Sequence, residues 1–277
     1  MTSATPLRTA DRYVVIGNPV AHSLSPTIHA RFSEQTGEAL EYTTLLAPVD
    51  GFAQSVGAFF SGGGRGANIT LPFKVEALRF ADEASARAKH AGAANFLAVR
   101  DGRVFADNTD GAGLVTDLRA NLGFTLRGAR ILLLGAGGAA RGVIAPLTQA
   151  GPSRIVLANR TLAKAQELAD HFPGLVACGL ESIANAPFDL VVNATSTSTR
   201  GEALALPDNL FAPGALAYDM AYGPAARAFV ERARALGAAR ASDGLGMLVE
   251  QAAESFQLWR GKRPQTAPVL AELRARA

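Results

Sequence analysis

An apolar run that ends in a cluster of glycines is the feature that most constrains this 277-residue chain. Residues 130–134 (RILLL) are followed by Gly-Ala-Gly-Gly-Ala-Ala and then by a helix-forming stretch. Gly135 permits the tight turn after a strand, Gly137 lets the backbone approach a pyrophosphate, and Ala140 is small enough for close helix–strand packing. The pattern predicts a dinucleotide-binding βα turn, with a loop that serves packing alone as the alternative. The predicted cofactor-binding residues of this turn are Gly135, Ala136, Gly137, Gly138 and Ala139.

The end of the next apolar run indicates which dinucleotide would bind. Residues 154–158 lead into Asn159-Arg160-Thr161, and Lys164 follows. A site for an unphosphorylated ribose usually has an acidic residue about 20 positions past the glycines, whereas arginine there favours a 2′-phosphate. No Asp or Glu occurs at this point, so Asn159, Arg160, Thr161 and Lys164 predict NADP rather than NAD. The alternative is that both cations are solvated residues at a helix start, although cations there oppose the helix dipole.

Composition excludes several classes of protein. The chain is 48% hydrophobic and 18% charged, which suffices for one large or two ordinary domains. Its net charge of +3 comes without a Lys/Arg block or interleaved aromatic residues, which argues against nucleic-acid binding. No stretch is apolar enough to span a membrane, and residues 1–9 lack a signal-peptide core. We therefore expect a cytoplasmic protein whose partners are small molecules.

Cysteine and histidine give no sign of metal or thiol chemistry. The four histidines show no metal-ligand spacing, so no metal site is predicted. Cys178 is the only cysteine, which excludes an intrachain disulfide. We expect it to be a small buried hydrophobic residue rather than a nucleophile.

The order of predicted elements indicates an α/β fold with two domains. Strands alternate with helices, which predicts a parallel sheet covered on both faces. We place an N-terminal domain at residues 1–110 and a Rossmann-type dinucleotide-binding domain at 111–243. Within the first, residues 62–66 are expected to be flexible, and strands 95–99 and 103–106 to pair around Asp101-Gly102. The helix at 246–260 cannot be assigned to either domain by its pattern, and a cleft between the domains would hold the substrate.

Eight short motifs in a fixed order carry a family resemblance. They are Ser23-Leu24-Ser25-Pro26, residues 68–74 (NITLPFK), 92–95 (GAAN), 108–111 (NTDG), the glycine turn, residues 159–161 (NRT), 193–196 (NATS) and 244–251 (GLGMLVEQ). Together they resemble the shikimate dehydrogenase family from about residue 12 to about residue 262. Each motif alone is modest, but their shared order is specific.

The resemblance implies a reaction and an arrangement of domains. The reaction is the reversible NADPH-dependent reduction of 3-dehydroshikimate to shikimate, in the pathway to aromatic amino acids. The first domain would bind substrate and carry catalysis, completed by residues 244–277 as the C-terminal helix folds back onto it. Dimers occur in this family, but the sequence has no interface signature, so a homodimer is left open.

The resemblance also implies residue roles. Lys74 and Asp110 match the catalytic pair: a lysine beside an aspartate can stabilise a developing alkoxide and relay its proton. Asp110 could alternatively be a helix N-cap, as could Ser25. The positions that match substrate contacts are Ser23, Ser25, Thr70, Asn95, Tyr222 and Gln251. Those that match the nicotinamide side are Met220 and Gly244, with core filling an equal alternative for Met220.

The sequence departs from the family pattern at two places, and it leaves two rival functions open. Ala30 replaces the asparagine common in the family, and Thr197-Ser198-Thr199-Arg200 replaces its usual Gly and Met beside the cofactor site. One rival is a dehydrogenase that also accepts quinate or NAD. The other is a nucleotide sensor without catalysis, which would be expected to have lost Lys74 or Asp110.

Overall fold

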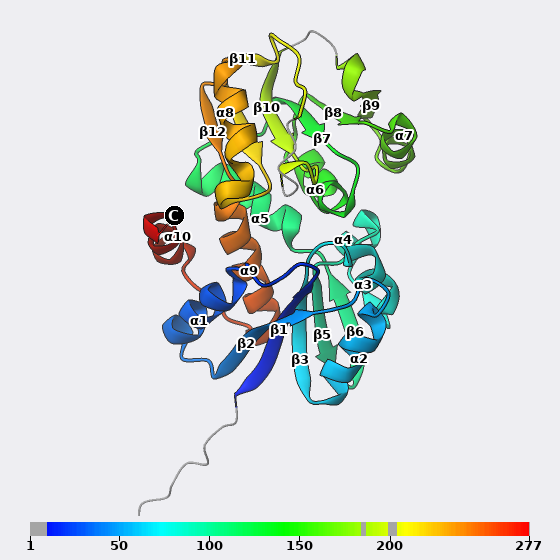
Figure 1. Ribbon diagram of the computed structural model, residues 1–277, viewed down its shortest axis with the longest axis vertical. Coiled ribbons are helices and arrows are strands. Elements are labelled where there is room, and N and C mark those ends of the chain that lie inside the picture. The colour runs from blue at the N-terminus through cyan, green and yellow to red at the C-terminus, as the bar shows by residue number, and fades with distance from the viewer. Residues whose placement is uncertain (1–9, 184–186, 199–203, 277) are drawn as a thin grey trace, which may run out of the picture.

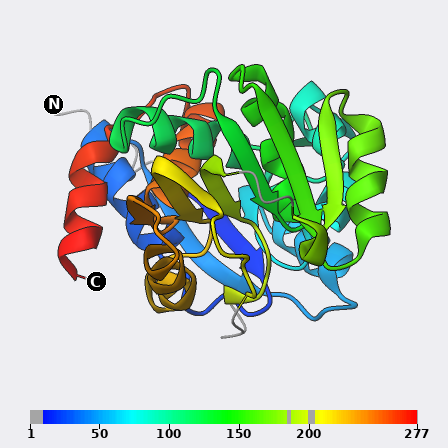
Figure 2. The same cartoon turned by 90° about the horizontal axis from the view of Figure 1, so that it is seen from above.

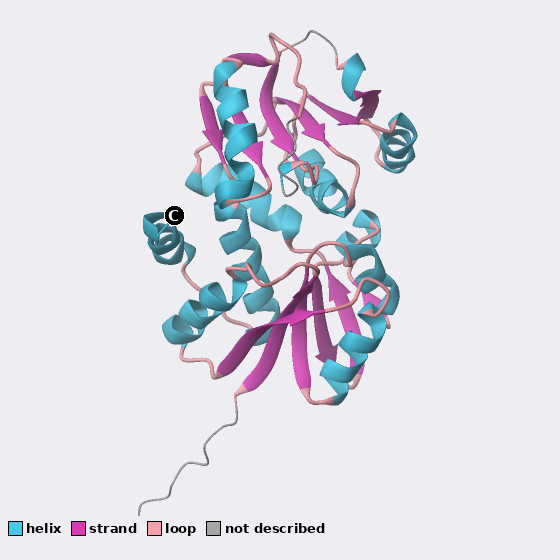
Figure 3. Ribbon diagram, viewed as in Figure 1, coloured by secondary structure: helices cyan, strands magenta, loops and turns pink. Residues whose placement is uncertain are grey.

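The computed structural model describes residues 10–183, 187–198 and 204–276, and it consists of two sheet units stacked along its long axis (Figure 1). The first unit holds a six-stranded sheet in the order β2-β1-β3-β5-β6-β4. Its strands are β1 (Asp11–Gly17), β2 (Leu40–Leu46), β3 (Gly64–Ile69), β4 (Glu83–Ala84), β5 (Phe96–Arg100) and β6 (Arg103–Asp107). Helices cover both faces of this sheet (Figure 3). They are α1 (Ser25–Thr36), α2 (Phe52–Ser61), α3 (Lys74–Phe80) and α4 (Ala86–Ala91). Helices of the C-terminal segment, described below, complete the face that α1 covers.

The second unit has the strand order of a dinucleotide-binding fold. Its sheet runs β12-β11-β10-β7-β8-β9, and every neighbouring pair is parallel. The chain starts at the central strand β7, moves outward, and then crosses to β10 on the other side, which is the Rossmann order. The strands are β7 (Arg130–Leu134), β8 (Arg154–Asn159), β9 (Leu175–Gly179), β10 (Phe188–Asn193), β11 (Phe211–Asp219) and β12 (Arg240–Ser242). The helices are α6 (Gly138–Gln149), α7 (Leu162–His171) and α8 (Arg227–Ala235), with the short turns η2 (Leu180–Ser182) and η4 (Gly223–Ala226).

Two helices join the units, and glycines set how closely they pack. Helix α5 (Asp110–Thr116) continues as a π-helical segment, η1 (Asp117–Asn121), and lies between α6 and α9 (Leu245–Arg260). A Cβ at Gly111 would lie 2.6 Å from the Gly142 carbonyl of α6. A Cβ at Gly113 would lie 2.8 Å from the backbone nitrogen of Gln251 on α9. The two glycines therefore let α5 touch both neighbours, and they fix where its first residue, Asp110, stands.

The C-terminal segment returns to the first unit. Helix α9 buries Val249 and Phe256 against Ile28 and Phe32 of α1, and α10 (Thr266–Arg276) adds Leu270 to this core. Seen from above, α10 and α7 lie at opposite sides of the molecule (Figure 2). The predicted return of the C-terminal helix is confirmed, whereas the division of the chain at residues 110 and 244 stays a prediction. Among the described residues, no helix is both long and apolar enough to cross a membrane.

Several local expectations were wrong. The segment expected to be flexible starts a strand, because β3 begins at Gly64. Its glycines serve packing: a Cβ at Gly66 would overlap the Trp259 ring and one at Gly64 the Phe59 ring. By contrast, the antiparallel pairing of β5 with β6 around Asp101-Gly102 is as predicted, and since β5 also pairs antiparallel with β3 the first sheet is mixed. Cys178 is only half-buried, because β9 is an edge strand.

Candidate active site

Lys74 and Asp110 form an ion pair between the two sheet units. Lys74 is the first residue of α3, directly after the loop at residues 70–73 that follows β3. Asp110 is the first residue of α5. The Lys74 Nζ atom lies 2.6 Å from Asp110 Oδ2, and the two side chains are 13% and 6% exposed. Shielding from water strengthens the attraction between the charges. The Lys74 ammonium is thus held in place by a hydrogen bond that the Asp110 carboxylate accepts.

Asn95 occupies the other oxygen of the Asp110 carboxylate. Its Nδ2 atom donates to Asp110 Oδ1 at 2.8 Å, and its Oδ1 atom accepts from the backbone N–H of Thr109 at 2.7 Å. Because a backbone N–H can only donate, the orientation of the Asn95 amide is determined. Each carboxylate oxygen of Asp110 therefore receives a hydrogen bond, which fixes the direction of the ion pair.

Gln251 reaches the same cluster from α9. Its Nε2 atom donates to the Leu248 carbonyl at 2.8 Å, while Oε1 lies 3.3 Å from Asn95 Nδ2 and 3.3 Å from Thr109 Oγ1. Its side chain is largely buried. Four residues predicted for the site, Lys74, Asn95, Asp110 and Gln251, are thus brought together from four separate segments of the chain.

The serine loop lies before α1 and meets the second unit at Tyr222. The Ser25 backbone N–H donates to Ser23 Oγ at 3.2 Å, and Ser25 is buried. Tyr222 and Leu24 both pack against the core around α9, and burial raises the pKa of the Tyr222 hydroxyl. Thr70 follows β3, is half-buried, and is held by its backbone N–H to the Ile16 carbonyl at 2.9 Å.

Both capping alternatives are wrong. Helix α1 starts at Ser25 itself with Leu24 as its N-cap, and α5 starts at Asp110 with Thr109 as its N-cap. Neither N-cap residue makes a side-chain capping bond. The Ser25 and Asp110 side chains are therefore not accounted for by helix capping. Ala30 is exposed, so the loss of a polar residue there leaves no gap in the core.

The glycine turn fits a pyrophosphate. Gly135 has a φ of +104°, and a Cβ there would lie 3.0 Å from the Ala194 carbonyl, so only glycine is tolerated without strain. Helix α6 begins at Gly138 with Gly137 as an N-cap that offers no side-chain bond. A Cβ at Gly137 would meet no atom within 4 Å. The first N–H groups of α6 have no acceptor within the helix, and the exposed Gly137 leaves open space beside them, as an anion site at a helix N-terminus requires.

This turn also adjoins the ion pair. A Cβ at Gly138 would lie 3.5 Å from the Lys74 Cβ atom. Ala139, the next residue of α6, is half-buried. A dinucleotide bound at the start of α6 would therefore have the Lys74 side chain beside it.

The predicted 2′-phosphate residues lie at the end of β8, next to the turn. The Gly135 N–H donates to the Ala158 carbonyl at 2.8 Å, and Asn159 Nδ2 donates to the Thr161 carbonyl at 2.9 Å. Arg160 and Lys164 are exposed, and within the parts of the chain that the structure describes neither forms a salt bridge. Two exposed cations that follow this strand fit an additional phosphate.

Met220 and Gly244 meet where β11 ends and α9 approaches. The Met220 N–H donates to the Asn193 carbonyl at 2.9 Å, and the Gly244 N–H donates to the Ala221 carbonyl at 2.8 Å. A Cβ at Gly244 would lie 2.5 Å from the Met220 carbonyl oxygen. Met220 is half-buried and packs partly against the core of the second sheet, so its predicted nicotinamide role and its core role both stay open.

Residues 197–200, where the sequence departs from the family pattern, are held by hydrogen bonds at the start of the segment. Ser198 is buried, and its Oγ atom donates to Asp219 Oδ2 at 2.6 Å and accepts from Asn193 Nδ2 at 2.9 Å. Burial raises the pKa of Asp219. Thr197 lies beside this anchor, whereas Thr199 and Arg200 lie outside the described residues.

Three further residues belong to this cluster but were not among the site residues predicted from the sequence. Asn108 Oδ1 accepts from the backbone N–H of Asp110 at 3.1 Å, and Thr109 links Asn95 with Gln251. Ser255 lies one helical turn after Gln251 and contacts Thr109. Asn108 and Thr109 belong to the motif that flagged Asp110, and the i, i+4 spacing from Gln251 could have identified Ser255.

Comparison with known proteins agrees with this geometry. Residues 15–97 match the shikimate dehydrogenase substrate binding domain, residues 118–201 the shikimate/quinate 5-dehydrogenase family, and residues 244–274 the shikimate 5′-dehydrogenase C-terminal domain. The chain is 54% identical to shikimate dehydrogenase (NADP(+)) of Hahella chejuensis over 266 residues, which is 95% of this chain and 98% of the relative. It is 56% identical to the protein of that name from Dechloromonas aromatica over 270 residues, or 96% and 98%.

A solved structure shows the same architecture. Shikimate 5-dehydrogenase from Thermus thermophilus, in complex with NADP(H) and shikimate, superposes with a TM-score of 0.85 at 37% identity, covering 96% of this chain and 99% of that one. The resemblance predicted from eight motifs is thereby confirmed. The chain belongs to the shikimate dehydrogenase family.

Proposed function

We propose that the protein catalyses the reversible NADPH-dependent reduction of 3-dehydroshikimate to shikimate, as a cytoplasmic enzyme of aromatic amino acid biosynthesis. The observation that carries the proposal is the buried Lys74–Asp110 pair, which lies directly beside the first residue of α6. Such a position joins a proton donor to a dinucleotide site. Relatives named for this activity share more than half of their residues with the chain.

The geometry of the second unit supports an assignment of the cofactor-binding residues. Bound NADPH would supply the hydride. Gly135 to Ala139 would receive its pyrophosphate at the start of α6, and Arg160 and Lys164 would pair with the 2′-phosphate, beside Asn159 and Thr161. Met220 and Gly244 would line the nicotinamide end.

Lys74 and Asp110 would handle the proton. The Lys74 ammonium would donate a hydrogen bond to the substrate carbonyl oxygen and stabilise the negative charge that grows there during reduction. Transfer of a Lys74 proton to that oxygen gives the alcohol. Asp110, 2.6 Å from Nζ, would accept a hydrogen bond from the ammonium and hold it in place beside the substrate.

The remaining polar residues would recognise the substrate. Ser23 and Ser25 provide hydroxyl donors for its carboxylate, with Tyr222 on the facing unit. Neutral groups that both donate and accept suit ring hydroxyls, which are the proposed partners of Thr70, Asn95 and Gln251. The substrate unit would comprise residues 1–110 with 244–277, and the cofactor unit residues 111–243.

Initial rates of four substrate–cofactor pairs test the proposal. Purified protein would be assayed with shikimate and with quinate, each with NADP and with NAD. We expect turnover mainly with shikimate and NADP. Comparable turnover of quinate with NAD would leave the fold and the ion pair intact but overturn the substrate and cofactor. Absence of turnover in all four assays would favour a non-catalytic nucleotide sensor.

A further inference from the structure

Ser255 is a fully buried hydroxyl behind the candidate active site. It lies on α9, four residues after Gln251, and has 0% exposure. Its Oγ atom lies 2.9 Å from Asn68 Nδ2 and 3.2 Å from Thr109 Oγ1. It thus connects β3, which carries Asn68, to Thr109, the N-cap residue of α5, without lying beside the Lys74–Asp110 pair itself.

The direction of the hydrogen bond from Asn68 to Ser255 is determined by its neighbours. Asn68 Nδ2 also donates to the Asn95 carbonyl at 3.3 Å, and a carbonyl can only accept. Asn68 Oδ1 in turn accepts from the Tyr42 hydroxyl at 2.8 Å. Ser255 therefore accepts from Asn68, and its single hydrogen is left for Thr109.

The same reasoning fixes the amide of Gln251. Its Nε2 atom donates to the Leu248 carbonyl, so Oε1 is the atom that faces Thr109 and Asn95. When Thr109 Oγ1 accepts from Ser255, its own hydrogen is available for Gln251 Oε1 at 3.3 Å. One hydrogen of Nε2 then has no partner in the cluster and is available to a ligand.

We propose that Ser255 is a positioning residue which, acting through Thr109, holds the Gln251 amide so that it offers an N–H donor to an oxygen of the substrate ring. This inference rests on the proposed function, because it takes Gln251 as a substrate contact. Without the Ser255 hydroxyl, Thr109 can donate to Asn95 Oδ1 at 3.2 Å instead, and of the two donors that face Gln251 Oε1 only Asn95 Nδ2, at 3.3 Å, is left to orient the amide. The affinity for substrate should fall while the cofactor site is unchanged.

The test compares Ser255→Ala with Ser55→Ala. Ser55 is a matched control, because its Oγ atom bonds the carbonyl one turn back on α2, remote from the site. We expect Ser255→Ala to raise the KM for shikimate about tenfold, the usual effect of one buried hydrogen bond, with the KM for NADP within about twofold. A purely structural role would lower the melting temperature without selectively raising the KM for shikimate.

A second pair of variants keeps the inference testable if Ser255→Ala does not fold. Thr109→Ser retains the hydroxyl that relays the bond, and Thr109→Val removes it with little change in shape. We expect only Thr109→Val to raise the KM for shikimate, and its effect to be less than additive with Ser255→Ala. An unchanged KM for shikimate in Ser255→Ala, or equal effects of both Thr109 variants, would overturn the inference. Wild-type turnover of shikimate tests the proposed function separately, since the inference concerns only the ratio of variant to wild type.

Discussion

Lys74 Nζ lies 2.6 Å from Asp110 Oδ2, while Asn95 donates to the other carboxylate oxygen at 2.8 Å. Asp110→Asn keeps the shape of the side chain but removes the charge that holds the ammonium. We expect kcat to fall about 10²–10⁴-fold, the usual contribution of a positioned acid–base group, with NADP affinity nearly intact. Steady-state kinetics and a fluorescence titration with NADPH measure the two quantities. Asp101→Asn, in an exposed turn where asparagine tolerates the positive φ, is the control, and retention of more than half of kcat by Asp110→Asn would contradict the assignment.

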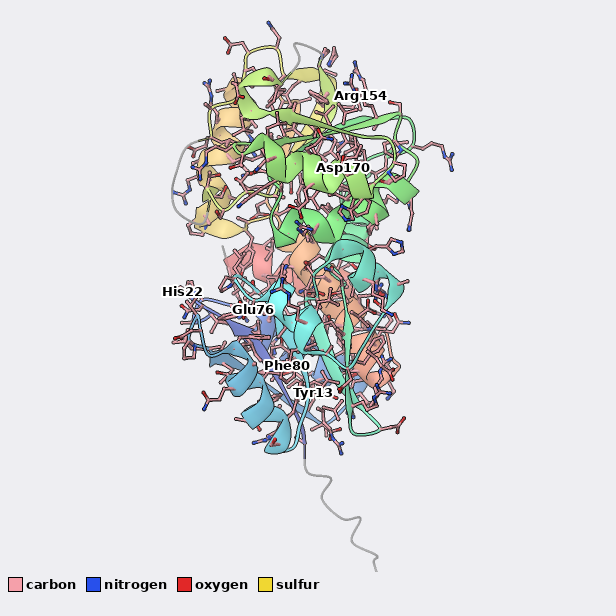
Figure 4. All side chains as sticks on the ribbon, turned by 90° about the vertical axis from the view of Figure 1, so that its right-hand side faces the viewer. Tyr13, His22, Glu76, Phe80, Arg154 and Asp170 are labelled. Atoms are coloured by element: carbon pink, nitrogen blue, oxygen red, sulfur yellow. The ribbon has the colours of Figure 1, made fainter. Side chains whose placement is uncertain are left out.

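Arg160 is expected to distinguish NADPH from NADH. The Arg160→Ala change should weaken NADPH binding about 10–100-fold, because a charge-assisted contact to the 2′-phosphate is lost, and should change NADH binding less than about twofold. Dissociation constants of both cofactors are the readout. Arg154 begins the same strand at its other end, in the upper part of the second unit (Figure 4), so Arg154→Ala should bind NADPH like wild type. Equal weakening of both cofactors by Arg160→Ala would exclude a 2′-phosphate contact.

Gly246 leaves room for the buried carboxylate of Asp117. A Cβ at Gly246 would overlap that carboxylate, which accepts from the Tyr218 hydroxyl at 2.6 Å. Gly246→Ala should therefore lower the free energy of unfolding by about 1–3 kcal/mol, as overpacking does. A Cβ at Gly57 on α2 would meet no atom within 4 Å. Gly57→Ala should therefore raise the free energy of unfolding by up to about 1 kcal/mol. Urea unfolding compares the two, and equal stability of both variants would show that the close approach is relieved without cost.

His29 should make the protein sensitive to acid. Burial lowers its pKa from 6.5 to about 3, it stacks on Tyr42 at 4.1 Å, and neither ring nitrogen has a hydrogen-bond partner among the described residues. Between pH 6.5 and about 3 the unfolded state binds a proton that the folded state does not, so stability falls as pH falls, by up to about 1.4 kcal/mol per pH unit.

His29→Phe should reduce this dependence on pH. Unfolding free energies of the variant and of wild type would be measured from pH 7 to pH 4. The exposed His22, which lies on the loop before α1 (Figure 4), provides the control His22→Gln. An unchanged slope in His29→Phe would show that other groups cause the acid sensitivity.

Local pattern was sufficient where neighbours in sequence determine the structure. Gly135 needs its positive φ to turn directly after β7, so the turn and its helix could be predicted from adjacent residues. The role of Gly66 could not, because it depends on Trp259, which another part of the fold places above it. A glycine-rich segment that packs under a ring has the same composition as a flexible loop.

The candidate site was predictable only in part for the same reason. Gln251 lies 156 residues beyond Asn95, and no periodicity indicates that their amides meet at 3.3 Å. Only the order of the motifs, through the family resemblance, placed them in one site. Ser255 belongs to none of those motifs, and its contact with Thr109 depends on the packing of α9 on α5.

The most direct test of the account is the activity of Lys74→Ala in shikimate oxidation with NADP. Lys89→Ala, an exposed lysine on α4, is the control for loss of a lysine. The account predicts that kcat of Lys74→Ala falls about 10²–10⁴-fold while the dissociation constant for NADPH stays nearly unchanged. Full activity in Lys74→Ala would contradict the claim that the Lys74–Asp110 pair carries the proton in this reaction.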